Sequence, residues 1–274
     1  MADRSAEGTE ADRLSRETGA RRKAGVGAMF DRIAARYDLL NHLLSGGTDL
    51  LWRRHAVRAL EVKAGGLYLD LAAGTGDYAF TILARQPDCR VLALDLAPRM
   101  LERMGEKARR RGLTERVCLL RGDGERLPLA DASLDGLAIG YGIRNFPDKR
   151  QALLECGRVL KAGGRLAILE LAGIPHPLLR RLFGLYFRLL LPVIGRLVSG
   201  DAMAYSYLPA SVEQFPPREQ FLAWMREAGL ADAHCRELSL GVSTLFIGTR
   251  LTGPTTLVEG NIAAPDETTA RQKF

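Results

Sequence analysis

A short apolar run that ends in a glycine turn is the first part of this chain that points to chemistry. Residues 67–71 are typical of a buried parallel strand, and Gly74-Thr75-Gly76 follow it almost directly. Glycines let the backbone turn sharply and let a ligand approach where a side chain would otherwise stand. This arrangement indicates a site for a nucleoside-type cofactor.

A carboxylate ends the next apolar run. Asp95 follows residues 91–94 and stands nineteen residues after Gly76, the place where doubly wound folds bind a ribose diol. The dinucleotide fingerprint would need a third glycine where this chain has Ala79. Asp77 would be unfavourable beside a pyrophosphate but is compatible with a cationic sulfonium. The pattern therefore favours S-adenosylmethionine over a dinucleotide.

Strand and helix patterns alternate through the middle of the chain, which predicts an α/β fold with a mostly parallel sheet and helices on both faces. Further strands are expected at residues 117–121, 134–139, 165–171, 231–238 and 242–250, the last two as a hairpin. Ligands bind at the carboxyl ends of such strands. Thr75, Asp95, Asp123 and the loop 140–146 all follow strand ends, so they should meet at one crevice.

The outer parts of the chain differ from this alternation. Residues 1–25 and 251–274 predict a disordered arm and a disordered tail around one domain at 26–250. Within that domain, residues 26–60 have the spacing of amphipathic helices, and residues 205–217 are expected to form a loop.

Residues 174–216 are expected to form an insertion that faces the substrate or a membrane surface. Its apolar run should not span a bilayer, because four arginines interrupt it: Arg180, Arg181, Arg188 and Arg196. A helix packed on the domain and an interfacial helix both fit this pattern.

Composition narrows the classes of function. A formal net charge of +7 is mild for 274 residues, and the basic residues are not grouped with aromatic ones. Nucleic acid is therefore not expected, and an anionic membrane surface is the favoured charged partner. The four cysteines include no Cys-x-x-Cys pair and the four histidines lack metal-ligand spacing, so we expect reduced thiols, a cytoplasmic protein and no bound metal.

The chain resembles the ubiquinone and menaquinone biosynthesis C-methyltransferases over roughly residues 26–250. The resemblance rests on Tyr37-Asp38-Leu39-Leu40-Asn41, Ser45-Gly46-Gly47, Trp52-Arg53, Leu69-Asp70-Leu71-Ala72, Gly74-Thr75-Gly76-Asp77, Gly142-Ile143-Arg144-Asn145, Tyr207-Leu208-Pro209, Ser211-Val212 and Phe215-Pro216. It implies the class I S-adenosylmethionine-dependent methyltransferase fold, a Rossmann-like sheet of seven strands whose last strand is antiparallel.

The resemblance also implies the reaction, which is methylation of a ring carbon of a polyprenylated quinol. Demethylmenaquinol is the first expectation, and the benzoquinol of the ubiquinone route, or both acceptors, are alternatives. Such an enzyme would be cytoplasmic or peripheral on the inner face of the cell membrane. A homodimer is compatible with the sequence. A non-catalytic binding module is the alternative from another class.

By position, the resemblance and the glycine turn together imply these cofactor contacts: Gly74, Thr75, Gly76, Asp95, Asp123, Gly124 and Gly140. Gly140 departs from the serine often found in the family, and Gly124 stands where alanine is frequent. Asp49 stands where many members carry histidine. These departures leave the side-chain contacts at the three positions open.

Three residues are the predicted catalytic set. Deprotonating a quinol hydroxyl pushes charge onto the ring, and Arg144 can stabilise that phenolate-like state. Asn145 and Tyr37 can orient hydroxyls. Because arginine stays protonated, a water held by Arg144 and Asn145 is the expected proton acceptor. Each residue also has a structural alternative: ion-pair partner for Arg144, helix cap for Asn145 and packing for Tyr37.

Overall fold

The computed structural model describes residues 13–251, except 15, 18, 173–180, 182–183 and 186–201. Most of the predicted arm, most of the predicted insertion at 174–216 and the predicted tail from 252 onward lie outside the described residues. Among the helices that are described, none is both long and apolar enough to cross a bilayer.

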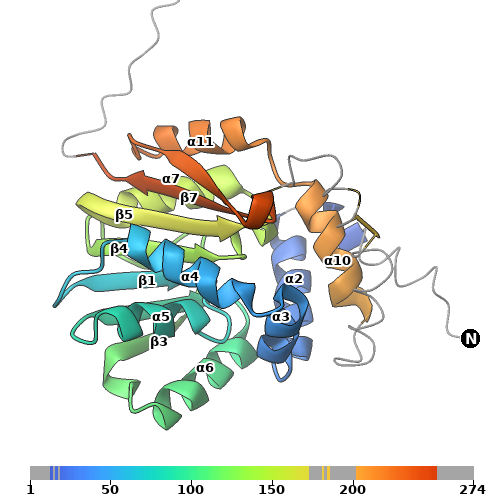
Figure 1. Cartoon of the computed structure of the whole chain (residues 1–274), viewed down its shortest axis with the longest axis horizontal. Coiled ribbons are helices and arrows are strands. Elements are labelled where there is room, and N and C mark those ends of the chain that lie inside the picture. The colour runs from blue at the N-terminus through green and yellow to red at the C-terminus, as the bar shows by residue number, and fades with distance from the viewer. Residues whose placement is uncertain are drawn as a thin grey trace, which may run out of the picture.

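Seven strands form one sheet in the order β3-β2-β1-β4-β5-β7-β6 (Figure 1). Their bounds are β1 Leu67–Leu71, β2 Arg90–Asp95, β3 Val117–Arg121, β4 Leu134–Gly140, β5 Leu160–Glu170, β6 His234–Leu238 and β7 Ser243–Thr249. Strands β1 to β5 are parallel, whereas β7 pairs antiparallel with both β5 and β6. The predicted fold class and closing hairpin are confirmed.

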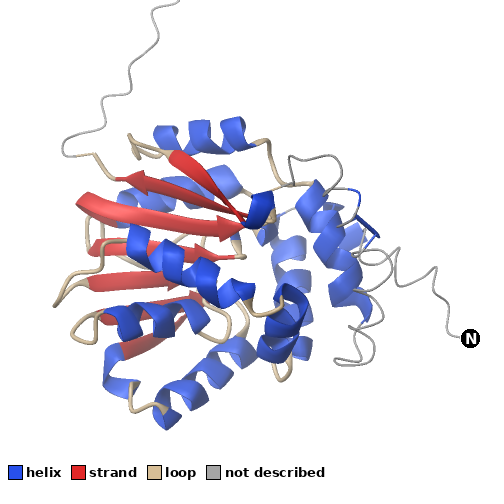
Figure 2. Ribbon diagram, in the orientation of Figure 1, coloured by secondary structure: helices blue, strands red, loops and turns tan. Residues whose placement is uncertain are grey.

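Helices cover both faces of this sheet (Figure 2). Their bounds are α2 Gly19–Ile33, α3 Tyr37–Ser45, α4 Thr48–Ala59, α5 Asp77–Arg85, α6 Pro98–Arg110, α7 Lys149–Val159, α10 Ala202–Glu213 and α11 Arg218–Glu227, with short 3-10 turns η1 Thr114–Arg116, η2 Ile143–Asn145 and η4 Ser239–Gly241. Alternate residues of each inner strand point to opposite faces: Leu69 packs in the core under α7 and α11, whereas Tyr68 packs under α4 and α5. This two-sided burial explains the nearly continuous apolar runs of the inner strands.

The predicted boundary of the disordered arm at residue 25 is wrong. Helix α2 begins at Gly19, and the buried side chains of Val26, Met29 and Ile33 pack its apolar face against α6 and α10. The first turns contain good helix formers but few large apolar residues. Hydrophobic periodicity therefore begins later in the sequence than the helix does.

The predicted loop at 205–217 is also wrong over most of its length. Residues 202–213 form α10 even though Pro209 lies inside it. A proline in a helix interior costs about 3 kcal/mol. Burial of Tyr207 and Ser211 favours the helix, since Tyr207 packs in one apolar cluster with Val26 and Met29 of α2. Tertiary packing thus outweighs the local preference.

A buried carboxylate anchors the glycine turn. Asp70 of β1 is 1% exposed, and its Oδ2 accepts the backbone N–H of Ala79 at 2.9 Å. Burial raises the pKa of Asp70 to about 7, although the Ala79 N–H and the charge of Arg53 act in the opposite direction. The side chain of Asp70 therefore links β1 to the first turn of α5. Because its pKa is raised, folding favours the protonated carboxyl group.

The sign of this shift predicts how stability depends on pH. Because the folded pKa of Asp70 exceeds the ordinary 3.8, its stabilising contribution is complete below the ordinary pKa and is lost as pH rises through about 7. Relative to Asp70→Asn, the unfolding free energy of the wild type should fall by up to roughly 1.4 kcal/mol per pH unit in that window. Urea unfolding of both proteins across the window measures this difference. A constant difference would contradict the shift.

Packing between α7 and α11 requires a glycine. A Cβ on Gly157 would overlap the carbonyl oxygen of Ala228, which is backbone and cannot turn aside. Gly157→Ala should lower the free energy of unfolding by about 1–3 kcal/mol in denaturant titration. The matched control is Gly105→Ala in α6, where the added carbon meets only Leu119 Cδ1 at 3.2 Å. Equal losses in both variants would show that helix packing is not the cause.

Candidate functional site

A first cavity of about 80 Å³ lies where the parallel strands end. The loops after β1, β2, β3 and β4 form its floor, and Lys23, Val26, Gly27 and Phe30 of α2 cover it. In Figure 1, α2, α3 and α10 stand beyond the arrowheads of β4 and β5. The expected meeting of separate strand-end segments at one crevice is therefore seen in the structure.

Seven predicted site residues line this first cavity: Tyr37, Gly74, Asp95, Asp123, Gly124, Gly140 and Asn145. The other two predicted cofactor contacts do not. The hydroxyl of Thr75 donates to Asp38 of α3, and Gly76, with φ of 88°, lies against Met104, where a Cβ would come within 2.6 Å of Cγ. Thr75 and Gly76 thus contact α3 and α6 and are not part of the cavity lining.

Asp95 joins two of the cavity-forming loops. Its Oδ2 accepts the N–H of Gly74 and its Oδ1 accepts the N–H of Ala97, both at 2.8 Å. Burial raises the pKa of Asp95 despite these hydrogen bonds. The N–H of Leu96 is a third donor to Asp95, so one of the four acceptor positions of the carboxylate is left for a ribose hydroxyl.

The carboxylate after β3 is paired with the helix that covers the cavity. Lys23 Nζ lies 2.6 Å from Asp123 Oδ2 and 2.6 Å from Glu125 Oε2. Burial lowers the pKa of Lys23, but the two carboxylates outweigh that effect and the pKa is raised. Sequence reasoning missed Lys23 and Glu125, because it expected residue 23 in a disordered arm.

Neighbouring rings explain two of the departures from the family pattern. A Cβ at Gly140 would lie 2.8 Å from the Tyr78 ring, and a Cβ at Gly124 would lie 2.7 Å from the Phe146 ring. Both distances are shorter than side-chain carbons tolerate. The aromatic rings therefore fill the space that serine or alanine would need.

The polar groups of the first cavity fit S-adenosylmethionine. Asp95 supplies ribose acceptors, and Asn145 Oδ1 is buried without a hydrogen-bond partner among the described residues. Such an orphaned acceptor is costly unless a ligand donates to it. The carboxylates of the cavity suit a nucleoside and a cationic sulfonium better than a phosphate.

A second cavity of about 340 Å³ adjoins the first. It is lined by Tyr37, Asn41, Leu44, Ser45, Thr48, Asp49, Trp52, Arg53, Tyr141, Arg144, Leu171, Leu208, Ser239 and Val242. Tyr37 and Tyr141 line both cavities. Trp52 and Tyr141 place their rings 6.3 Å apart in this second cavity. Tyr37 and Tyr141 therefore stand at the boundary between the two cavities.

Arg144 lies in the second cavity and is oriented by a buried carboxylate. Its Nη1 lies 2.9 Å from Glu170 Oε1, its backbone N–H donates to Glu170 Oε2 at 3.1 Å, and its side chain also donates to the carbonyl of Tyr141. Burial lowers the pKa of Arg144, but the Glu170 charge outweighs it and raises the pKa. Glu170 is fully buried and was not predicted. The sequence feature that could have indicated Glu170 is the presence of a charged residue within the expected apolar strand 165–171.

The catalytic trio is divided between the two cavities. Arg144 lines the second cavity only, Asn145 lines the first only, and Tyr37 lines both. Burial raises the pKa of Tyr37, although its hydrogen bond to Asn41 and the charges of Arg144 and Arg53 oppose this. Arg144 and Asn145 are consecutive residues of η2 that line different, adjoining cavities, and the water shared between them stays a prediction.

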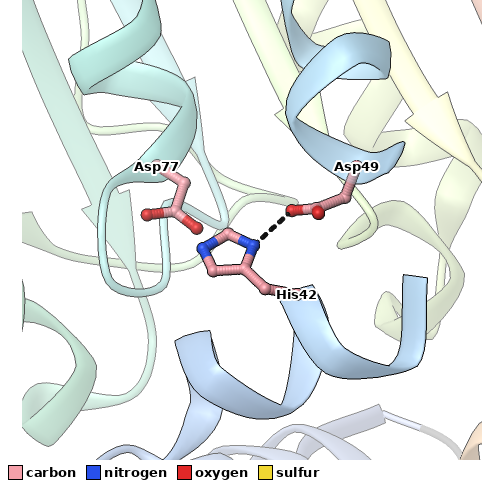
Figure 3. Close-up of side chains that lie close together, drawn as sticks. All are labelled: His42, Asp49 and Asp77. Carbon is pink, nitrogen blue, oxygen red and sulfur yellow. Dashed lines mark hydrogen bonds and ion pairs between the residues drawn. The ribbon is translucent and has the colours of Figure 1, made fainter. Parts of the chain in front are cut away.

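His42, Asp49 and Asp77 form a group of metal-ligand type, with ligand atoms within 4.8 Å of one another (Figure 3). His42 Nδ1 lies 2.9 Å from Asp49 Oδ2. Arg53 pairs with Asp49 and Lys107 Nζ lies 2.8 Å from Asp77 Oδ1, so both carboxylates already have cationic partners. Burial would raise the pKa of each carboxyl, yet these cations and the hydrogen bond from Ser45 to Asp49 hold both values low. An added metal ion would meet these two positive side chains.

Comparison of sequences identifies the relatives of the chain. The model of the ubiE/COQ5 methyltransferase family matches residues 17–250. The ubiquinone/menaquinone biosynthesis C-methyltransferase UbiE of Syntrophotalea carbinolica is 46% identical over 81% of this chain and 92% of its own length. The demethylmenaquinone methyltransferase of Thermus thermophilus is 45% identical over 81% of this chain and 100% of its own length.

Solved structures agree on the fold. A SAM-dependent methyltransferase from Aquifex aeolicus has a TM-score of 0.54 at 17% identity, with 74% of this chain and 92% of that chain covered. The [4+2]-cyclase SpnF has a TM-score of 0.60 at 16% identity, with coverage of 83% and 96%. Family match, relatives and fold lead to one conclusion: the chain belongs to the ubiE/COQ5 methyltransferase family and is an S-adenosylmethionine-dependent C-methyltransferase.

Proposed function

We propose that this enzyme methylates a ring carbon of a polyprenylated quinol, with demethylmenaquinol as the preferred acceptor. The observation that carries the proposal is the pair of adjoining cavities, the first with Asp95 and Asn145 in its wall, the second with Arg144 and the rings of Trp52 and Tyr141 in its wall. The names of the relatives support a quinone as the acceptor. The benzoquinol of the ubiquinone route is the alternative acceptor.

In this proposal, the first cavity holds the methyl donor. Asp95 accepts hydrogen bonds from the ribose, and Asp123 and Asn145 supply further acceptors in the same wall. S-adenosylmethionine supplies an electrophilic methyl group when it is bound. Positioning of donor and acceptor, with water excluded, can supply about 7–11 kcal/mol of the barrier reduction.

The second cavity holds the quinol beside Arg144. A hydroxyl proton of the quinol passes to a water in this cavity, which leaves a phenolate-like oxygen whose charge Arg144 stabilises. The ring carbon then forms its bond to the methyl group as the bond from sulfur to methyl breaks, and the proton on that carbon passes to water in the cavity, which restores the aromatic ring. Glu170 positions the guanidinium, and Tyr37 orients the acceptor at the boundary between the cavities.

Replacement of Arg144 tests this role. Arg144→Gln should lower kcat by about 10²- to 10³-fold, as loss of one oxyanion-stabilising donor does elsewhere. Cofactor affinity should stay within about threefold, because Arg144 does not line the first cavity. Turnover with labelled S-adenosylmethionine and calorimetric binding measure the two effects.

Two further variants serve as controls. Arg144→Gln leaves Glu170 buried without its partner, so Arg144→Gln/Glu170→Gln tests whether an uncompensated charge caused the loss. Arg150→Gln removes an arginine that pairs with Glu227 on the surface, and it should keep full turnover. Unchanged turnover of both Arg144 variants would remove Arg144 from the mechanism.

A competition between acceptors tests the substrate. Reduced demethylmenaquinone and the demethylated benzoquinol are offered together with the same prenyl tail, detergent and labelled donor. We expect the naphthoquinol to be methylated preferentially, because the tilted rings of Trp52 and Tyr141 offer more stacking area to two fused rings than to one. Equal methylation would indicate a dual enzyme. Cofactor binding without transfer to either quinol would contradict the proposal and favour a binding module.

A further inference from the structure

Five exposed leucines lie on the three segments that wall the second cavity. Leu39 and Leu43 of α3 are 61% and 54% exposed, and Leu50 and Leu51 of α4 are 46% and 53% exposed. Leu240 of η4 is 74% exposed, more than any other large apolar side chain among the described residues. The same three segments supply most of the cavity lining, so these leucines belong to the walls of the proposed acceptor site.

Contacts between the segments bring these leucines to one part of the molecule. Helices α3 and α4 pack against each other, and Trp52 Nε1 of α4 donates to Ser239 Oγ of η4 at 2.9 Å. Leu39 and Leu43 are four residues apart and so share a face of α3. Figure 1 shows α3 beside the start of α4, at the end of the sheet where β5 terminates.

The backbone of η4 holds Leu240 in an unfavourable conformation. Leu240 has φ of 59° and ψ of 29°, and Ser239 before it also has a positive φ of 48°. This left-handed region is rarely adopted by leucine, and such strain persists only where the surrounding structure imposes it. Here the fold imposes strain and exposes a large apolar side chain at the same position, which indicates an external apolar partner.

The charges beside these leucines favour an anionic partner. Arg54 and Arg58 follow Leu50 at four-residue spacing on α4, and both are exposed. The carboxylates of α3 and α4 are engaged by cations, because Asp38 pairs with Lys107 and Asp49 pairs with Arg53. The outward charge of this region is therefore positive.

We propose that Leu39, Leu43, Leu50, Leu51 and Leu240, together with Arg54 and Arg58, form a docking surface for an anionic lipid bilayer. The leucines enter the boundary between headgroups and acyl chains, and the arginines contact the headgroups. This inference rests on the proposed function, because a polyprenyl tail is dissolved in the bilayer and the quinol ring must leave it. Docking beside the second cavity lets the ring enter without crossing water.

Flotation on vesicles tests the surface directly. The full-length protein is mixed with vesicles of phosphatidylglycerol and phosphatidylcholine, or of phosphatidylcholine alone. The surface variant is Leu39→Ser/Leu51→Ser/Leu240→Asn, in which asparagine tolerates the left-handed backbone. We expect it to bind anionic vesicles at least about tenfold more weakly than the wild type, because apolar area is lost. Arg54→Glu/Arg58→Glu should also weaken binding, and added salt should weaken wild-type binding.

The matched control removes exposed leucines elsewhere. Leu119 of β3 and Leu154 of α7 are 38% and 39% exposed and lie on other elements, so Leu119→Ser/Leu154→Ser should float like the wild type. Equal flotation of the surface and control variants, or no flotation of the wild type, would overturn the proposal. Self-association through these leucines without flotation would overturn it too, since a second copy would then be the partner.

Activity measurements separate this inference from the proposed function. With a short-tailed quinol dissolved in buffer, the surface variant should keep the wild-type kcat and KM, because none of its substituted residues lines either cavity. With a long-tailed quinol in vesicles, its KM should rise by about the same factor as its vesicle binding falls. Failure of the wild type on every quinol would contradict the proposed function while the flotation result stands by itself.

Discussion

Two cationic side chains, Lys107 and Arg53, hold α3 and α4 against the ends of the strands, and the second cavity depends on them. Lys107 of α6 lies 2.8 Å from Asp38 of α3 and 2.8 Å from Asp77 of α5. Arg53 of α4 pairs with Asp49 and lies 3.7 Å from Asp77. Buried ion pairs add little net stability over an apolar core, but removal of one partner is costly. The network therefore fixes where α3 and α4 lie, and with them the walls of the site.

Two different parts of the fold form the site: the loops at the strand ends, and the helices and turn that lie over them. The parallel strands end in short loops that present carboxylates and glycines at one edge, as this topology requires. The second cavity instead takes its walls mainly from α3, α4 and η4, outside the parallel core of the sheet. Tyr37 and Tyr141 stand at the boundary between the two. The wall of the first cavity is thus set by the strand ends of the fold, and the wall of the second cavity by the helices and the turn added around them.

Proteins that share this fold catalyse different reactions, which is consistent with a site formed by two different parts of the fold. A methyltransferase and a [4+2]-cyclase both superpose on the chain at under 20% identity. Fold alone does not determine the reaction, which depends on the groups placed around the site. In this chain the groups around the second cavity include Arg144 with its buried partner Glu170, and the aromatic pair of Trp52 and Tyr141.

The sequence by itself determined the sheet, its helices and its ligand-binding edge, because alternating apolar runs and glycine turns are local patterns. Asp95 and Asp123 were placed correctly at that edge for the same reason. Only the tertiary structure decided the start of α2 at Gly19, the helix through Pro209, and the pairing of Lys23 with Asp123. Each of these depends on contacts between residues far apart in the chain, and burial or charge pairing there outweighs local propensity.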